Sequence, residues 1–280
     1  MGETNLLIFS ICLQAAIGIT LFSLLGGLLY RDKQFKTASY LAAFLAVMGI
    51  LASFTHLGHP LSALNVFGGF GRSWLSNEAI LAGIFAGLAV LNAVIVYLKP
   101  DDKGLITGIT GLGSLLGLVV VFSMAKIYTT ASVPAWQGIN TYVDFYTTTI
   151  ALGALLFLAA GFRSLRDANK KVFGYAILVA VAIQAATSIP HILNLNQMGL
   201  AAQDSLRVLN SISGLIWVKW VLVLSGAALL LLPANAGKIS RKDKSPSKIL
   251  FVAGMALVVG QIIGRYLFYA ALVVMNVGLV

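Results

Sequence analysis

The residues best suited to chemistry lie between positions 54 and 79, in a polar segment that separates two long apolar stretches. The segment reads FTHLGHPLSALNVFGGFGRSWLSNEA and contains two of the three histidines, His56 and His59, together with Arg72 and Glu78. Imidazole, with a reference pKa of about 6.5, exchanges protons near neutral pH. A histidine and a carboxylate placed close together are typical of general acid–base chemistry.

The elements that must position these groups are transmembrane helices. Hydrophobic residues make up 59% of the 280 residues and charged residues 10%, against about 25% charged residues in a soluble domain. The apolar stretches are long enough to cross a hydrocarbon core of about 30 Å. We therefore predict an all-α, polytopic membrane protein that forms one integral membrane domain over residues 1–280. The eight spans are expected at about 5–30, 38–56, 77–98, 104–128, 144–163, 172–193, 207–232 and 248–273.

Basic residues are distributed very unevenly between the connecting segments. The segments after the first, third, fifth and seventh spans contain fourteen of the 19 lysines and arginines, whereas the alternate segments contain only Arg72 and Arg207. The positive-inside rule then predicts that both termini lie outside, on the periplasmic side of a bacterial inner membrane. The same rule explains the net charge of +10 without a nucleic-acid partner.

This topology places the polar residues of the spans at one surface. Arg265 lies about seventeen residues into the last span, or roughly 26 Å from its start at 1.5 Å per residue. We expect it at the outer end, with His56, Glu78 and Lys126. Ionisable residues inside a membrane are functional candidates by default.

The sequence permits a structural explanation for each of these residues. His56 fits either a general base or an interfacial histidine bonded to a carbonyl oxygen. Glu78 fits either a proton acceptor or a first-turn carboxylate beside a capping Asn77 or Ser76. Arg265 fits either an anion-binding group or a structural ion pair, and Arg72 is a second candidate cation for an anion.

Three further residues are candidates for a ligand pocket, and one pair of histidines is a candidate for haem ligation. His59, Trp74 and Lys126 are candidate pocket residues, although tryptophans are also common as interfacial anchors. The only cysteine, Cys12, lies in an apolar stretch, so we expect no metal or iron–sulfur site in this protein. A haem held by His56 and His191 is a less favoured alternative.

Small residues recur within the spans at a spacing that permits close helix contact. Gly83 and Gly87 form one GxxxG pattern, and Gly113 and Gly117 form another. In an apolar helix this pattern predicts packing against a neighbouring helix.

Four ordered blocks of sequence resemble a known family. They are HLGHPLSALN at 56–65, SWLSNE at 73–78, IYTTASVPAW at 127–136 and GRYLFYA at 264–270. Their order, the eight spans and the length resemble the DmsC family, the membrane anchor subunits of bacterial dimethyl sulfoxide reductases. The presence of His59 is a departure, because some relatives have a small residue at the matching position.

The resemblance implies a role in anaerobic respiration. It implies that the protein binds menaquinol, releases menaquinone and passes electrons to an iron–sulfur partner subunit with four [4Fe–4S] clusters. A second partner subunit would hold a molybdenum bis-pterin cofactor. His56 matches the family histidine associated with quinol binding, Glu78 matches the glutamate of LSNE, and Arg265 matches the arginine of GRxLFY.

Two other classes of function remain open at this point. One is a purely structural anchor without a quinone site. The other is a small-molecule transporter, which would show midplane charges or broken helices in two related halves. Lys219 is the one candidate for a midplane charge, and the sequence shows no convincing repeat.

Overall fold

The structure is a computed structural model that describes residues 2–30, 34–55, 60–162, 164–165, 167–235 and 248–273. This part of the protein is helical throughout and contains no strand. Eight helices are long and apolar enough to cross a membrane, which confirms the predicted fold class. They are α1 (Gly2–Leu29), α2 (Lys36–Thr55), α3 (Trp74–Leu98), α4 (Lys103–Thr129), α5 (Ile139–Gly161), α6 (Asp167–Asn194), α8 (Ser213–Asn235) and α9 (Lys248–Ala270).

The seventh span begins later than predicted. The expected span 207–232 is interrupted at Ile212, and a separate helix, α7 (Leu200–Ser211), precedes α8. The leucines and valine of α7 extend the hydropathy of α8 towards the N-terminus, but α7 is amphipathic and carries the exposed ion pair Arg207–Asp204. Lys219 therefore lies in the second turn of α8 and not at the middle of a span.

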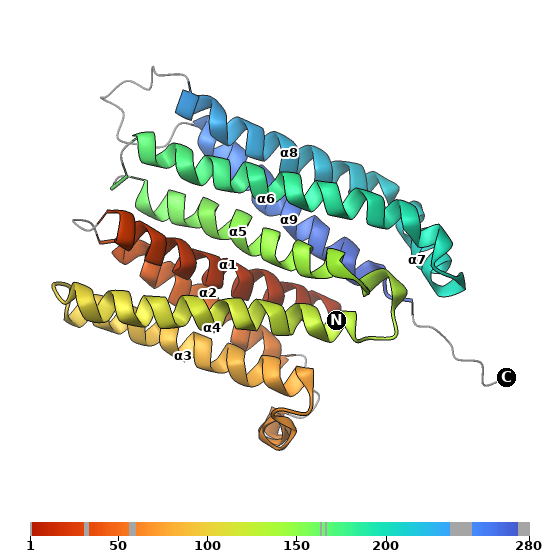
Figure 1. Cartoon of the computed structure of the whole chain (residues 1–280), viewed down its shortest axis with the longest axis horizontal. Coiled ribbons are helices and arrows are strands. Elements are labelled where there is room, and N and C mark those ends of the chain that lie inside the picture. The colour runs from red at the N-terminus through yellow and green to blue at the C-terminus, as the bar shows by residue number, and fades with distance from the viewer. Residues whose placement is uncertain are drawn as a thin grey trace.

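The helices form a bundle with α1 and α5 at its centre (Figure 1). In α1 and α5, 61% and 67% of the most apolar window is buried, against 33–39% in each of the other six spans. Helices α3 and α4 pack together at one side of this pair, and α6, α8 and α9 pack at the other side.

The central pair is packed backbone to backbone. A Cβ atom on Gly18 of α1 would lie 2.6 Å from Cα of Gly153 in α5 and would also overlap the carbonyl oxygen of Thr149. Only glycine at both positions lets the two helices approach this closely. Neither glycine belongs to the GxxxG patterns at positions 83–87 and 113–117.

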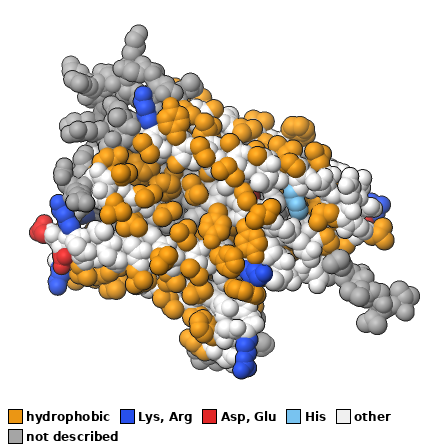
Figure 2. All heavy atoms as spheres, in the orientation of Figure 1, with side chains coloured by type: hydrophobic (Ala, Val, Ile, Leu, Met, Phe, Trp, Pro, Cys, Tyr) orange, Lys and Arg blue, Asp and Glu red, His pale blue; other side chains and the backbone are white. Residues whose placement is uncertain are grey.

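The surface around the middle of the bundle is apolar. Figure 2 shows hydrophobic side chains over most of the visible face, with acidic and several basic side chains gathered at one end. Large exposed residues include Phe44 at 60%, Leu115 at 65% and Phe251 at 67%. Such a surface is compatible with hydrocarbon rather than with water.

The two ends of the bundle differ in structure. At the basic end, the backbone turns from α3 to α4 through Pro100–Asp102, with exposed Lys99 and Lys103 on either side. At the other end lie η1 (Pro60–Gly69), η2 (Pro134–Trp136), η3 (Leu195–Gln197) and α7, and α1 begins and α9 ends there (Figure 1). We call the latter the capped end. Its assignment to the periplasmic side remains a prediction.

Candidate functional site

Arg265 is the most deeply buried charge in the described part of the protein, with 1% of its surface exposed. Its Nη2 atom lies 3.5 Å from Oδ2 of Asp144 in α5 and donates a hydrogen bond to Oε1 of Gln14 in α1 at 3.1 Å. The guanidinium also lies over the ring of Phe145, 3.7 Å from its centre. Its Nε and Nη1 atoms have no hydrogen-bond partner among the described residues. The expected structural ion pair is therefore present, and it leaves donors of the guanidinium unused.

A network of amides and hydroxyls supports the carboxylate of Asp144. Gln184 of α6 donates to Oδ1 of Asp144 at 2.8 Å, and Gln261 of α9 donates to Oε1 of Gln184 at 3.0 Å. Thr148 donates to Oε1 of Gln261 at 3.1 Å. The network joins α5, α6 and α9 one turn or more inside the capped end. Interhelical hydrogen bonds of this kind contribute about 0.6–2 kcal/mol each in a membrane.

Glu78 is buried on α3, with 7% of its surface exposed. Helix α3 begins at Trp74 after Ser73, so Glu78 lies beyond the first turn and the predicted capping arrangement is wrong. The side chain of Asn77 instead accepts a hydrogen bond from the backbone amide of Gly71 at 2.7 Å. Glu78 therefore has no capping role that would explain its burial.

Two tyrosine hydroxyls form a pair within electrostatic range of Glu78 and Arg265. The hydroxyls of Tyr128 in α4 and Tyr269 in α9 lie 3.1 Å apart, and the charges of Glu78 and Arg265 lie within electrostatic range of both. Tyr128 also packs against Phe268 at 5.1 Å between ring centres. We call Glu78, Tyr128, Tyr269 and Arg265 the tyrosine cluster. It brings together two predicted site residues that are 187 positions apart in the sequence.

Two further predicted residues lie next to each other. The ammonium of Lys126 lies 5.9 Å from the centre of the Trp74 ring, and this ring contacts Phe122 edge-on at 6.0 Å. Lys126 and Trp74 belong to the outer surface of α4 and α3, and Trp74 is 38% exposed. This pair lies at the capped end, on the surface formed by α3 and α4.

Of the remaining residues predicted for the quinol site, the structure describes only Arg72, which is not part of the tyrosine cluster. Arg72 is exposed in the turn between η1 and α3, where its backbone amide donates to the carbonyl of Gly69 at 3.1 Å. His56 and His59 lie outside the described residues. Thr55, the residue before His56, ends α2, and α2 packs against both α1 and α3.

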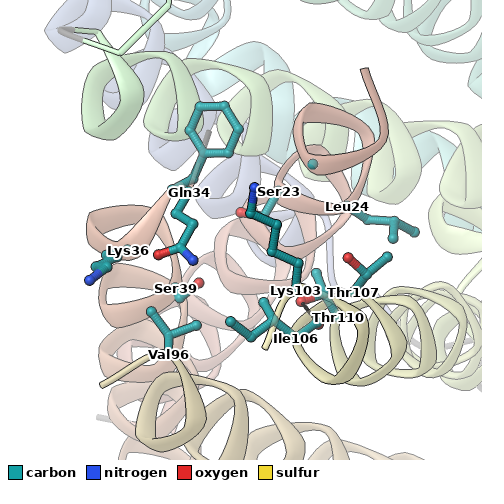
Figure 3. Close-up of a pocket in the computed structure, with 12 residues that line it drawn as sticks. Ser23, Leu24, Gln34, Lys36, Ser39, Val96, Lys103, Ile106, Thr107 and Thr110 are labelled. Carbon is teal, nitrogen blue, oxygen red and sulfur yellow. Dashed lines mark hydrogen bonds between the residues drawn. The ribbon is translucent and has the colours of Figure 1, made fainter. Parts of the chain in front are cut away.

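Two polar cavities lie at opposite ends of the bundle. One, of about 70 Å³, opens at the basic end between α1, α2 and α4 (Figure 3). Its lining includes Lys36, Lys103, Thr107 and Thr110, and the ammonium of Lys36 points away from its centre in Figure 3. None of the described candidate site residues lines this cavity. The other, also of about 70 Å³, lies at the capped end beside Asp144 and Lys219.

Several residues of the capped end are not predicted by the sequence. Gln14, Gln184 and Gln261 are single amides within apolar stretches, and this isolation is the available signal. The sequence places Asp144 near the start of a span but does not indicate its pairing with Arg265. Tyr128 and Tyr269 give no signal, because tyrosines are common at membrane interfaces.

The fold and the site define the class of protein. It is a polytopic helical membrane protein whose buried ionisable groups, among the described residues, lie towards the capped end of the bundle. It belongs to the DMSO reductase anchor subunit (DmsC) family, whose family model matches residues 1–271. The resemblance noted from the four sequence blocks is thereby confirmed.

Curated relatives agree with this assignment. The sequence is 26% identical over 275 residues to the C chain of anaerobic dimethyl sulfoxide reductase from Escherichia coli (strain K12), with 95% of this protein and 94% of the relative covered. It is 28% identical over 276 residues to the YnfH chain of the same organism and 26% identical over 276 residues to the C chain of the Haemophilus influenzae enzyme, with the same coverage. The protein is therefore a multi-pass membrane anchor of the DMSO reductase type.

Proposed function

We propose that this anchor subunit oxidises menaquinol at the capped end and passes the electrons to an iron–sulfur partner subunit. The observation that supports this most directly is the burial of Glu78 and Arg265 within electrostatic range of the paired hydroxyls of Tyr128 and Tyr269. A buried carboxylate, a buried arginine with unused donors and two hydroxyls are groups that can hold and deprotonate a hydroxylated ring. A purely structural anchor has no need of such a cluster.

The reaction requires a place for two protons and two electrons. Each quinol loses both protons and both electrons as it becomes a quinone. In the proposal His56, which follows the end of α2, accepts one proton, and Glu78 orients the imidazole or accepts the second proton. Arg265 stabilises the negative charge that develops on the ring oxygen. The electrons pass to an iron–sulfur cluster of the partner, and a molybdenum subunit reduces the terminal substrate.

The location of the partners follows from the predicted orientation. If the capped end is periplasmic, the iron–sulfur and molybdenum subunits dock on the periplasmic face of the inner membrane. In the proposal, Arg72, Trp74 and Lys126 lie between the quinol site and the docked partner or line the entrance of the site from the bilayer, and His59 stays a candidate residue of the pocket from the sequence. The exposed aromatic Trp74 suits contact with a quinone ring.

Binding of a quinone analogue by the purified complex tests the proposal. We expect His56→Arg to remove one equivalent of a fluorescent hydroxynaphthoquinone per anchor subunit, because the base that faces the ligand is replaced by a larger fixed cation. The measurement is a fluorescence-quenching titration, with Lys99→Met at the basic end as the control. Unchanged binding in His56→Arg would move the site elsewhere, and no binding by the wild type would leave the protein a scaffold.

Glu78 provides a second, kinetic test. Replacement by glutamine keeps the size of the side chain but removes its charge and its capacity to accept a proton, so we expect quinol-driven turnover to fall about tenfold. Turnover driven by a reduced dye, which supplies electrons directly to the partner subunits, should stay unchanged and shows that the complex is assembled. Asp101→Asn, at the basic end, is the matched control. A full quinol-driven rate in Glu78→Gln would remove Glu78 from the mechanism.

A further inference from the structure

The cavity at the capped end is lined by none of the four residues of the tyrosine cluster, although Asp144 in its lining pairs with Arg265. It has a volume of about 70 Å³ and is partly open. Residues of η2, α5, α6, α8 and α9 contribute to its lining. Trp136 and Phe268 form part of its wall, and both rings also contact Tyr128 edge-on, at 5.2 and 5.1 Å between ring centres. Neither Tyr128 nor Tyr269 lines the cavity. None of the described residues predicted for the quinol site lines it, but His191, the alternative haem ligand, does.

Lys219 is the only cation that lines this cavity among the described residues. Its side chain is 7% exposed and packs on Gly264, where a Cβ atom would lie 2.8 Å from Cε of the lysine. The ammonium lies 4.5 Å from the centre of the Trp220 ring. No hydrogen bond or ion pair joins Lys219 to another described residue. A lysine ammonium has three donors, and a buried one requires an acceptor.

The nearest carboxylate is already engaged. Asp144 lines the cavity and lies within electrostatic range of Lys219, but its oxygens serve Arg265 at 3.5 Å and Gln184 at 2.8 Å. Two buried cations therefore share one buried carboxylate. A ligand group that accepts a hydrogen bond or carries negative charge would give Lys219 the partner that Asp144 does not supply.

The same cavity also has an acceptor without a donor. The buried Oδ1 atom of Asn140 has no hydrogen-bond partner in the described structure. Nε2 of His191 lies 3.0 Å from the carbonyl oxygen of Ala135 and donates to it. Asn140 and His191 both line the cavity. A suitable ligand must therefore donate a hydrogen bond as well as accept one.

We propose that this cavity binds one hydroxyl-bearing edge of an aromatic ligand of the quinol class. A phenolic hydroxyl accepts a hydrogen bond from Lys219 and donates one to Oδ1 of Asn140, which gives both unpaired groups a partner. Trp136, Trp220 and Phe268 supply aromatic surface for the ring. The site is distinct from that of Glu78, and it rests on the proposed function only in that the membrane quinol pool supplies the ligand.

The size of the cavity limits what enters it. A water molecule occupies about 30 Å³ of liquid, so about 70 Å³ holds two waters or a hydroxyl with the adjoining ring carbons. The rest of a naphthoquinol ring would lie towards the open side. Two ordered waters or a small inorganic anion are the competing occupants.

The test is the number of equivalents of a fluorescent hydroxynaphthoquinone that the purified complex binds. We expect two equivalents per anchor subunit in the wild type. Lys219→Met, which keeps the length of the side chain but removes its charge, should weaken one of them at least tenfold. His56→Arg should remove the other, and Lys99→Met should retain both. Turnover driven by a reduced dye confirms that each variant is assembled.

Each outcome decides between the two hypotheses. A wild type that binds one equivalent, lost in His56→Arg and unchanged in Lys219→Met, keeps the proposed function and overturns the second site. The cavity then holds water or a small anion. A wild type that binds no analogue and does not oxidise quinol overturns both.

A second variant keeps the test decisive if Lys219→Met fails to assemble. Gly264→Ala retains every charge but introduces a Cβ atom 2.8 Å from Cε of Lys219, which displaces the ammonium. We expect the equivalent that depends on Lys219 to bind several-fold more weakly in Gly264→Ala. The equivalent that depends on His56 should be unchanged. Wild-type affinity for both equivalents in Gly264→Ala would contradict a role for the Lys219 ammonium.

Discussion

Replacement of Arg265 by methionine is expected to lower the free energy of unfolding by about 3–5 kcal/mol, because it leaves the buried carboxylate of Asp144 without its cation. Arg265 is 1% exposed, and the side chain of Asp144 is 11% exposed. Methionine approximates the length of the arginine stem, so loss of charge rather than loss of volume dominates. Reversible denaturation of the purified protein in mixed micelles measures the change.

A matched exposed pair and a double variant control this experiment. Arg207 and Asp204 form an ion pair of 2.8 Å in α7, with side chains 78% and 50% exposed. Arg207→Met should change the stability by less than about 1 kcal/mol. Arg265→Met combined with Asp144→Leu should regain part of the lost stability, because neither charge then remains unpaired. Equal effects of Arg265→Met and Arg207→Met would show that the buried pair contributes no more than an exposed one.

Gly18→Ala is expected to destabilise the protein by about 3 kcal/mol, the upper part of the usual range for overpacked cores. Its Cβ atom would lie 2.6 Å from Cα of Gly153 and overlap the carbonyl of Thr149. Both obstacles are backbone atoms, so no side-chain rotation relieves them, and α1 and α5 must separate. The same denaturation measurement reports the loss, and Gly153→Ala should behave alike.

The glycines of α3 provide the control. A Cβ atom at Gly83 or Gly87 has no neighbour within 4 Å in the described structure. Gly83→Ala should therefore be neutral or stabilise by up to about 1 kcal/mol, because alanine has the higher helix propensity. A loss of stability in Gly83→Ala as large as that in Gly18→Ala would contradict the close packing of α1 on α5.

The positions of the spans could be predicted from the sequence, whereas the contacts between them could be predicted only in part. Bilayer thickness fixes how long each apolar stretch must be, so hydropathy located all eight helices. Which face of a helix meets its neighbour depends on its rotation about its own axis. Gly117, from one GxxxG pattern, packs closely on Ile17 of α1 as expected. The GxxxG pattern at Gly83 and Gly87 predicted a contact that is absent between described residues, and Gly18 and Gly153 carried no such pattern.

The candidate site, like the fold, could be predicted from the sequence only in part. Glu78 and Arg265 stood out because ionisable groups are rare in apolar stretches, and the structure brings both to the Tyr128–Tyr269 pair. Hydropathy is averaged over a window of many residues, so it does not reveal single uncharged polar groups around them, such as Gln184. Lys219 was assigned to the wrong depth because the apolar residues of α7 extended the predicted span towards the N-terminus.

The position of the buried charges also determines how the membrane potential acts on this protein. Arg265 lies seventeen residues from the start of α9 and Asp144 seventeen residues from the end of α5, or about 25 Å from the basic end of a core of about 30 Å. A proton released from this level to the capped end crosses on the order of one fifth of the field. At about 2.3 kcal/mol per charge for 100 mV, the potential contributes only about 0.5 kcal/mol per proton. In the proposed reaction the two protons of each quinol together contribute about 1 kcal/mol per 100 mV, which corresponds to about a fivefold difference in its equilibrium constant between energised and de-energised membranes.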